Sequence, residues 1–295
     1  MNRRRLALIE ALLVTIIWSS TFVIVKMGLE SLGPLTIAGL RYLIGSLILA
    51  PFLMLRRSSR APISKKLWLK LILIGISAYT IGNGALFWGL KFIPATTGSF
   101  LMSMIPLLVL FGGAILLKEI PTRWQIMGVI LSLFGSGLFF SSGLMPGEPQ
   151  GVVILSIGLL GFMAFSLLGR GIALDKQLDT LRLTTLPLLI GGGVSLLLAF
   201  TVERLPLITW RGFLIVSWLA IINTAGGYLL YNHALQELTV LEMNMVMNLS
   251  PLFTALLGWI LLGETLSLRQ IIGMLVVIGG VILVQRSANP EATKT

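Results

Sequence analysis

The chain has 295 residues, of which 56% are hydrophobic and only 11% are charged. Because a soluble domain carries about 25% charged residues, this composition excludes an ordinary water-soluble surface and indicates an integral membrane protein. The formal net charge of +11 does not indicate nucleic-acid binding, since the basic residues stand in short clusters between long apolar runs, as in the loops of membrane proteins. Cysteine is absent and histidine occurs once, so disulfides are excluded. We expect the protein to hold no metal or cofactor and not to be an enzyme.

Apolar segments long enough to cross a membrane follow one another along the chain. A helix needs about 20 predominantly apolar residues to cross the hydrocarbon layer, and proline, glycine or charged residues separate the segments that qualify. In chain order the expected spans are residues 6–27, 34–55, 67–90, 94–117, 124–142, 151–173, 180–202, 212–235, 240–262 and 269–286. The first follows three arginines, as in a signal peptide, but it reaches Lys26 without a small-residue cleavage pattern, so we expect it to stay uncleaved.

Lysine and arginine are distributed unevenly between the loops that would face the two sides of the membrane. When the N-terminus is placed in the cytoplasm, most basic residues fall on the cytoplasmic side, most clearly in the first half. The positive-inside rule therefore predicts that both termini are cytoplasmic. We expect a multi-pass protein embedded in the lipid bilayer.

The second half of the sequence repeats the first at a shift of about 145 residues. Each half then holds five spans, and because five is odd, the second half must enter the membrane from the opposite side. The sequence predicts an all-α integral membrane protein of ten transmembrane helices in two inverted five-helix repeats, residues 1–145 and 146–295, which form one transport unit. Such repeats are typical of secondary transporters with a substrate site near the midplane. The aligned pairs include Pro106 with Pro251, Glu119 with Glu264, Gly128 with Gly273, and Gly135 with Gly280.

Three segments carry a resemblance to a known family: Trp18-Ser-Ser-Thr-Phe-Val-Ile-Val-Lys26, Pro106…Lys118-Glu119 and Pro251…Gly263-Glu264. They resemble the signatures of the first, fourth and ninth helices of the drug/metabolite transporter superfamily, EamA type, over residues 6–286. The resemblance implies a ten-helix bacterial inner-membrane exporter of amino acids, related metabolites or drugs. It also implies a cavity lined mainly by helices 1, 3, 4, 6, 8 and 9. Phe162 and Arg170 stand where the first half has Trp18 and Lys26, so the halves are not expected to be interchangeable.

Polar and aromatic side chains within the spans indicate the face that avoids lipid. On the fourth and ninth spans they form one helical stripe each, in matching positions, and the third and eighth spans carry a second pair of stripes. The alternative is that the same groups hydrogen-bond neighbouring helices and serve packing alone. The candidate cavity residues are Trp18, Phe22, Tyr79, Asn83, Ser99, Met102, Ser103, Phe162, Tyr228, Asn232, Asn244, Met247 and Asn248.

Charged groups near the helix ends are candidates for gating or for coupling to protons: Glu10, Lys26, His233 and Glu242. Histidine is the side chain suited to a switch near physiological pH. The alternative, which is commoner for charged residues at helix ends, is a plain surface or snorkelling position. We expect Arg170 to snorkel toward the membrane surface. Arg41, inside the second span, needs a partner such as Glu30 or an outer carbonyl.

Remaining interpretations concern packing: Glu119 and Glu264 should bond the start of the next helix. The glycines of the fifth and tenth spans, spaced by seven residues, should allow close helix packing within one protomer, or across a homodimer. The sequence does not decide between a monomer and a homodimer.

Together these features predict a secondary active transporter that works by alternating access, with protons as the candidate coupling ion. The family resemblance implies that it exports amino acids or related small metabolites. The alternative within this class is an exporter of hydrophobic or cationic drugs, because the expected cavity is rich in methionine and aromatic residues. A membrane-embedded enzyme would need an acid/base or metal constellation that the sequence hardly supplies. A channel is a further alternative. The sequence has no Gly-Lys-Ser/Thr phosphate-binding motif, so it does not indicate that this chain uses ATP to drive transport.

Overall fold

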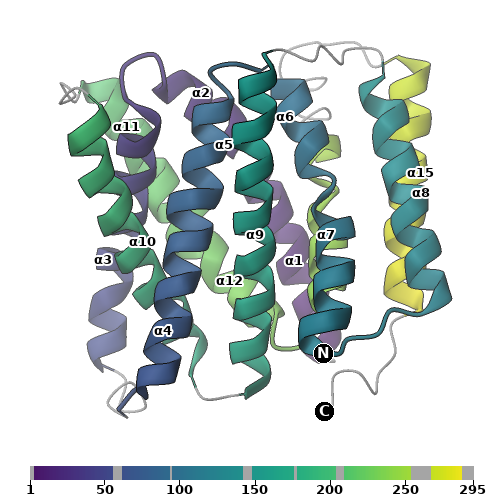
Figure 1. Ribbon diagram of the computed structural model, residues 1–295, viewed down its shortest axis with the longest axis horizontal. Coiled ribbons are helices and arrows are strands. Elements are labelled where there is room, and N and C mark those ends of the chain that lie inside the picture. The colour runs from purple at the N-terminus through teal and green to yellow at the C-terminus, as the bar shows by residue number, and fades with distance from the viewer. Residues whose placement is uncertain are drawn as a thin grey trace.

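The fold is seen in a computed structural model that describes residues 3–55, 62–93, 95–141, 148–175, 178–203, 209–253 and 267–287. Within these ranges all regular structure is helical (Figure 1). The α-helices are α1 (Arg3–Ser19), α2 (Thr21–Gly28), α3 (Pro34–Leu55), α4 (Lys65–Ile74), α5 (Asn83–Gly89), α6 (Ala95–Met102), α7 (Ile105–Gly112), α8 (Arg123–Phe140), α9 (Pro149–Asp175), α10 (Thr180–Val202), α11 (Trp210–Trp218), α12 (Gly227–Ala234), α13 (Val240–Met247) and α15 (Leu268–Arg286). Three π-helical segments, η2 (Gly75–Gly82), η3 (Gly113–Leu117) and η4 (Leu219–Gly226), continue α4, α7 and α11.

Eight helices in the described part are long and apolar enough to cross a membrane. They correspond to the second to eighth and the tenth expected spans, which confirms a helical, membrane-spanning chain. The first expected span, 6–27, is broken at Ser20 into α1 and α2. The ninth, 240–262, is described only as far as residue 253, so the expected number of ten remains a prediction.

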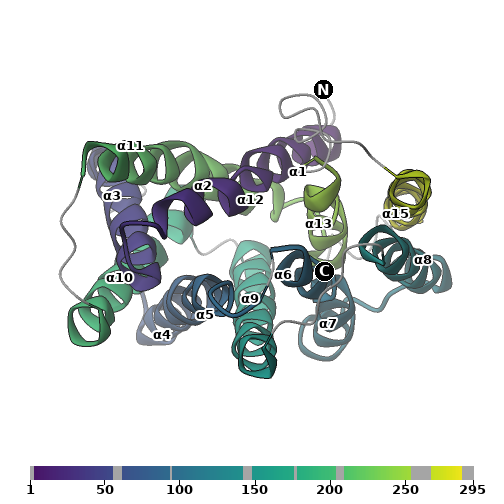
Figure 2. The ribbon, with the colours of Figure 1, turned by 90° about the horizontal axis from the view of Figure 1, so that it is seen from above.

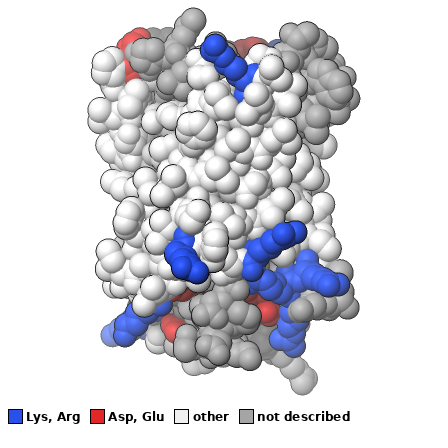
Figure 3. All heavy atoms as spheres, turned by 90° about the vertical axis from the view of Figure 1, so that its right-hand side faces the viewer, with Lys and Arg blue, Asp and Glu red and all other residues white. Residues whose placement is uncertain are grey.

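The face of the bundle seen in Figure 3 has a broad central belt without charged side chains. In that view, lysine and arginine gather mainly at one end of the molecule, the end at which the N-terminus lies in Figure 1. Large apolar side chains such as Ile130, Phe134 and Leu197 are more than half exposed on the surface of the bundle. In lipid such exposure is favourable, because the chains of the bilayer are as apolar as the side chains they contact.

Matching helices of the two halves are interrupted at matching places. α6 ends just before Ser103, with Pro106 following, and α13 ends just before Asn248, with Pro251 following. Proline has no N–H for the carbonyl four residues earlier, so each helix loses a backbone bond at its break. The π-helical segments η2 and η4 likewise occupy equivalent positions. Figure 1 shows that the helix α4–η2–α5 runs from the lower end to the upper end, whereas α11–η4–α12 runs from upper to lower.

The glycines of α8 and α15 allow these two helices to pack closely at one edge of the bundle (Figure 2). A Cβ atom built on Gly280 would lie 2.6 Å from the carbonyl oxygen of Gly128, and one built on Gly135 would lie 2.9 Å from that of Gly273. The prediction of close packing within one protomer is thus confirmed.

Candidate functional site

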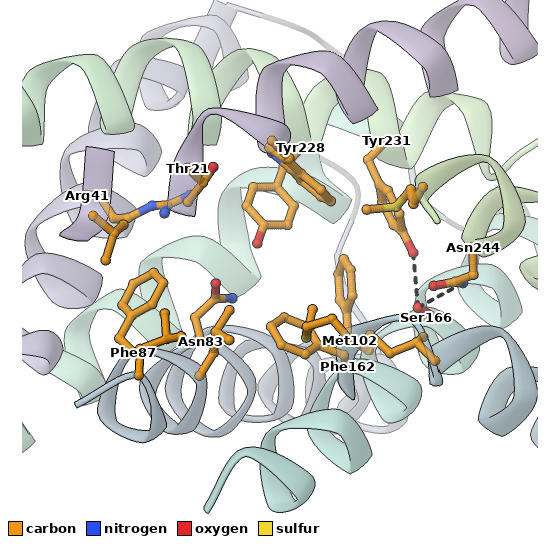
Figure 4. A pocket seen from close by; sticks show the side chains of 17 residues that line it. Thr21, Arg41, Asn83, Phe87, Met102, Phe162, Ser166, Tyr228, Tyr231 and Asn244 are labelled. Atoms are coloured by element: carbon orange, nitrogen blue, oxygen red, sulfur yellow. Dashed lines mark hydrogen bonds between the residues drawn. The ribbon is translucent and has the colours of Figure 1, made fainter. Parts of the chain in front are cut away.

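A cavity of about 100 Å³ lies between helices of the two halves and is lined by 17 residues (Figure 4). The first half contributes α1, α2, α3, α5, α6 and α7, and the second half contributes α9, α12 and α13. A neighbouring cavity of about 110 Å³ shares several of these walls. The side chains common to both are Trp18, Met102, Ile105, Asn244 and Met247.

Aromatic rings form most of one wall. The ring centroid of Trp18 lies 4.8 Å from that of Tyr228 and 5.5 Å from that of Tyr231. Phe165 stacks on Tyr231 at 5.1 Å. Such contacts hold the rings in fixed orientations, so the wall offers rigid apolar faces to a flat or aliphatic ligand.

A short hydrogen-bond network lies at one end of this wall (Figure 4). The hydroxyl oxygens of Ser166 and Tyr231 are 3.1 Å apart. The side-chain amide of Asn244 donates to Ser166 Oγ at 3.3 Å and to the carbonyl of Val240 at 2.8 Å. These groups are neutral, and they place hydroxyl and amide dipoles where a ligand of the cavity could reach them.

The opposite end of the cavity holds Arg41, which is 2% exposed (Figure 4). Its Nε donates to Thr224 Oγ1 at 3.0 Å, and its Nη1 has no hydrogen-bond partner among the described residues. The expected partner Glu30 instead pairs with Arg211. Arg41 therefore bonds a hydroxyl on η4, and not Glu30 or an outer carbonyl as expected.

The break between α1 and α2 is held by Asn223 of η4. Its side-chain amide donates to the carbonyl of Ile17 at 2.9 Å, to Ser20 Oγ at 3.2 Å and to Thr21 Oγ1 at 2.9 Å. In return, Trp18 Nε1 donates to the carbonyl of Asn223 at 2.8 Å. These bonds fix the indole of Trp18 in the cavity wall.

Sequence reasoning missed Asn223 because it relied on polar positions that match between the two halves. At the shift of 145 residues, the position equivalent to Asn223 is Ala78, which carries no polar side chain. A mid-span asparagine is costly in lipid unless it meets a partner, and that signal alone could have marked Asn223 as a residue that joins helices.

The candidate cavity residues fall into four groups. Seven line the first cavity, and Ser103 and Asn248 line the neighbouring one. Tyr79 and Asn232 are buried outside both walls, which corrects the expectation for these two: Tyr79 packs its ring against Tyr42 and Tyr228, and Asn232 donates to Thr184 Oγ1 at 3.0 Å. The side chains of Phe22 and Ser99 lie outside the described part. The seven are Trp18, Asn83, Met102, Phe162, Tyr228, Asn244 and Met247.

Two of the charged candidates form a pair. Glu10 Oε2 lies 2.8 Å from His233 Nδ1, in an open pocket between α1, α3, α10 and α12. Glu242 is fully buried, and its two oxygens accept from Arg4 and from the backbone N–H of Thr239. Glu242 thus already has structural partners, whereas Glu10 faces a group that can exchange a proton. The side chain of Lys26 is outside the described part.

Arg170 does not snorkel, which is a further correction. It is fully buried, its Nε donates to Glu119 Oε1 at 2.8 Å, and its Nη1 donates to the carbonyl of Leu235 at 2.7 Å. Glu119 Oε2 accepts from the backbone N–H of Val240 at 3.1 Å. Glu119 therefore bonds the first residue of α13, a later helix than expected. Glu264 lies outside the described residues.

Sequence reasoning also missed several lining residues. Tyr231 follows Tyr228 by three positions and therefore shares its helical face, a signal that could have been used. Phe165 likewise follows Phe162 by three. Arg41 was noticed only as a costly charge, because sequence alone does not show which side of α3 faces a cavity.

A bundle of membrane-spanning helices with a small cavity between two similar halves is the architecture of a membrane transporter. The model of the EamA-like transporter family matches the chain twice, over residues 5–141 and 150–286. The chain therefore belongs to the EamA-like transporter family.

Relatives of the chain are named as transporters. An uncharacterized inner membrane transporter of Escherichia coli (strain K12), YedA, is 28% identical over 274 residues, covering 91% of this chain and 87% of that protein. An S-adenosylmethionine/S-adenosylhomocysteine transporter of Chlamydia muridarum is 26% identical over 267 residues, covering 84% and 82%. One crystal structure superposes with a TM-score of 0.80 at 17% identity, over 96% of this chain and 99% of the other, and supports the fold.

Proposed function

We propose that the protein is a secondary active exporter that moves amino acids or related small metabolites across the inner membrane by alternating access. The observation that carries the proposal is the cavity between the two halves, with aromatic walls and a few polar groups. Such a lining suits a small ligand whose polar groups must be oriented in an otherwise apolar site.

The size of the cavities favours small metabolites over drugs. The two neighbouring cavities measure about 100 and 110 Å³, whereas pockets for drug-sized ligands are about 300–1,000 Å³. An engineered cavity of about 150 Å³ holds one benzene ring. A hydrophobic drug would therefore require a larger opening of the helices than an amino acid would.

The arrangement of the halves supports alternating access. The matching helices α4–η2–α5 and α11–η4–α12 run in opposite directions (Figure 1), as inverted repeats require. Near the last residues of α9, Arg170 and Glu119 tie that helix to the start of α13. A buried ion pair of this kind has two discrete states, formed and broken. It could therefore act as a gate that closes or opens one side of the cavity.

The substrate class and the coupling ion belong to the same proposal. The relative from Chlamydia muridarum is named for two amino-acid derivatives, and the family resemblance favours export. We assign proton coupling to the pair of Glu10 and His233, which lie in hydrogen-bond contact. The basic end of the surface supports a cytoplasmic N-terminus.

Counterflow in proteoliposomes tests the proposal. Vesicles that contain the purified protein are loaded with one unlabelled amino acid at a time, and entry of the labelled compound is followed. Transient accumulation above equilibrium with one of them is the expected result. Absence of accumulation for every amino acid, in vesicles that contain folded protein, contradicts the amino-acid assignment, and uptake of a hydrophobic cation instead would favour the drug alternative.

A further inference from the structure

Arg41 carries a charge for which the described part of the protein supplies no counterion. We propose that Arg41 binds the carboxylate of the transported molecule, so that the substrate is a small organic carboxylate with an apolar or aromatic body. This inference rests on the proposed function and narrows its substrate class.

The first observation is that the charge is buried and unpaired. Arg41 is 2% exposed, and it stands seven residues after the start of α3 at Pro34, about 10 Å along the helix axis. None of the ion pairs in the described part includes it. Arginine stays protonated in proteins, so the positive charge persists in a place where an isolated charge is costly.

The second observation is that the guanidinium is held in place. Thr224 fixes Nε at 3.0 Å, and the guanidinium carbon lies 4.8 Å from the ring centre of Tyr42 and 6.0 Å from that of Phe87. The rings offset part of the cost of the charge without neutralising it. Nη1 keeps an unused donor, and a planar guanidinium matches a carboxylate in shape.

The third observation is the position of Arg41 in the cavity. Figure 4 shows Arg41 at one end, Ser166 and Asn244 at the other, and Tyr228 and Phe162 between them. A molecule whose carboxylate reaches Arg41 would lay its body along the rings. One permanent cation matches the single negative charge of a carboxylate better than the double charge of a phosphate.

Binding to the purified full-length protein in detergent tests the proposal with a matched pair of probes. The probes are 3-phenylpropanoate and 3-phenylpropanamide, which differ in the charge of one group. We expect the wild-type protein to bind the acid about 30-fold or more tightly than the amide, because an unpaired buried charge remains when the carboxylate is absent. Equal affinity for acid and amide, or no binding of the acid, overturns the proposal without requiring any variant.

Variants of Arg41 distinguish a role in recognising the carboxylate from a role in stabilising the fold. Arg41→Gln should remove the preference for the acid, Arg41→Lys should retain part of it, and the exposed control Arg211→Gln should leave it unchanged. Without ligand, Arg41→Met should unfold at the same temperature as the wild type or higher, because the substitution removes an uncompensated charge. A fall in that temperature by several degrees, or an intact acid preference in folded Arg41→Gln, contradicts the proposal. If the protein binds the acid but shows no counterflow, the carboxylate site at Arg41 is supported and the proposed transport function is contradicted.

Discussion

Arg41 and Arg170 are both almost completely buried, but their surroundings differ. Arg170 has a carboxylate, Glu119, and a backbone carbonyl as partners, whereas Arg41 has one hydroxyl and two aromatic rings. Arg170 lies outside the walls of both cavities, and Arg41 lies in the wall of the first. Burial alone therefore does not identify a functional arginine. The charge that has no counterion among the described residues and lines a cavity is the one available to a ligand.

The largest expected effect follows from breaking the compensated pair. Glu119→Gln leaves Arg170 without its counterion, and removing one partner of a buried ion pair costs about 3–5 kcal/mol. Denaturant titration in detergent should show this loss of unfolding free energy. The control Glu30→Gln breaks the exposed pair with Arg211 and should cost at most about 1 kcal/mol. A folded, stable Glu119→Gln variant would show that the two arginines do not differ as described.

A smaller effect is expected from the seam of α8 and α15, whose residues line neither cavity. In Gly280→Ala the new Cβ would lie 2.6 Å from the carbonyl oxygen of Gly128, and overpacking costs about 1–3 kcal/mol. Gly137→Ala is the matched control, since no atom of the described residues lies within 4 Å of its Cβ. Gly280→Ala should unfold at a lower temperature than Gly137→Ala, and substrate preference should be unchanged in both variants. Equal melting temperatures would contradict the packing described.

The two asparagines of the ninth expected span should also differ in role, one contributing mainly to stability and the other mainly to transport. Asn248 donates to Ser132 Oγ of α8 at 2.9 Å, whereas Asn244 lies in the walls of both cavities. Asn248→Ala should lower stability by about 1 kcal/mol, and Asn244→Ala should weaken transport more than stability. Counterflow and thermal unfolding, measured on both variants, check this. The same loss of stability in both would favour packing as the role of each.

The smallest effect on stability is expected at the partly exposed pair of Glu10 and His233. Glu10→Gln should leave counterflow of the substrate unchanged, because counterflow needs no net proton movement. It should abolish the response of net transport to an imposed pH gradient, and His233→Gln should do the same. A normal response in Glu10→Gln would place proton coupling elsewhere in the protein.

Sequence reasoning reached the fold because hydrophobic length and basic loops are local properties of the chain. It located most of the wall of the cavity because helical phase predicts which side chains share a face. It placed Tyr79 and Asn232 on that wall incorrectly, since phase does not show which of two buried faces meets a cavity. The partners of Arg41 and Arg170 come from helices far away in sequence, and only the packed structure brings them together.

In the proposed mechanism, the cavity between the halves opens to each side of the membrane in turn and holds the substrate. The chain has no cysteine, so Met247→Cys, in the wall of both cavities, introduces a single thiol. Its labelling by a membrane-impermeant maleimide can be measured in vesicles of both orientations. We predict labelling from each side and protection by the transported compound. Labelling from one side only, unaffected by any compound that the protein transports, would contradict the claim.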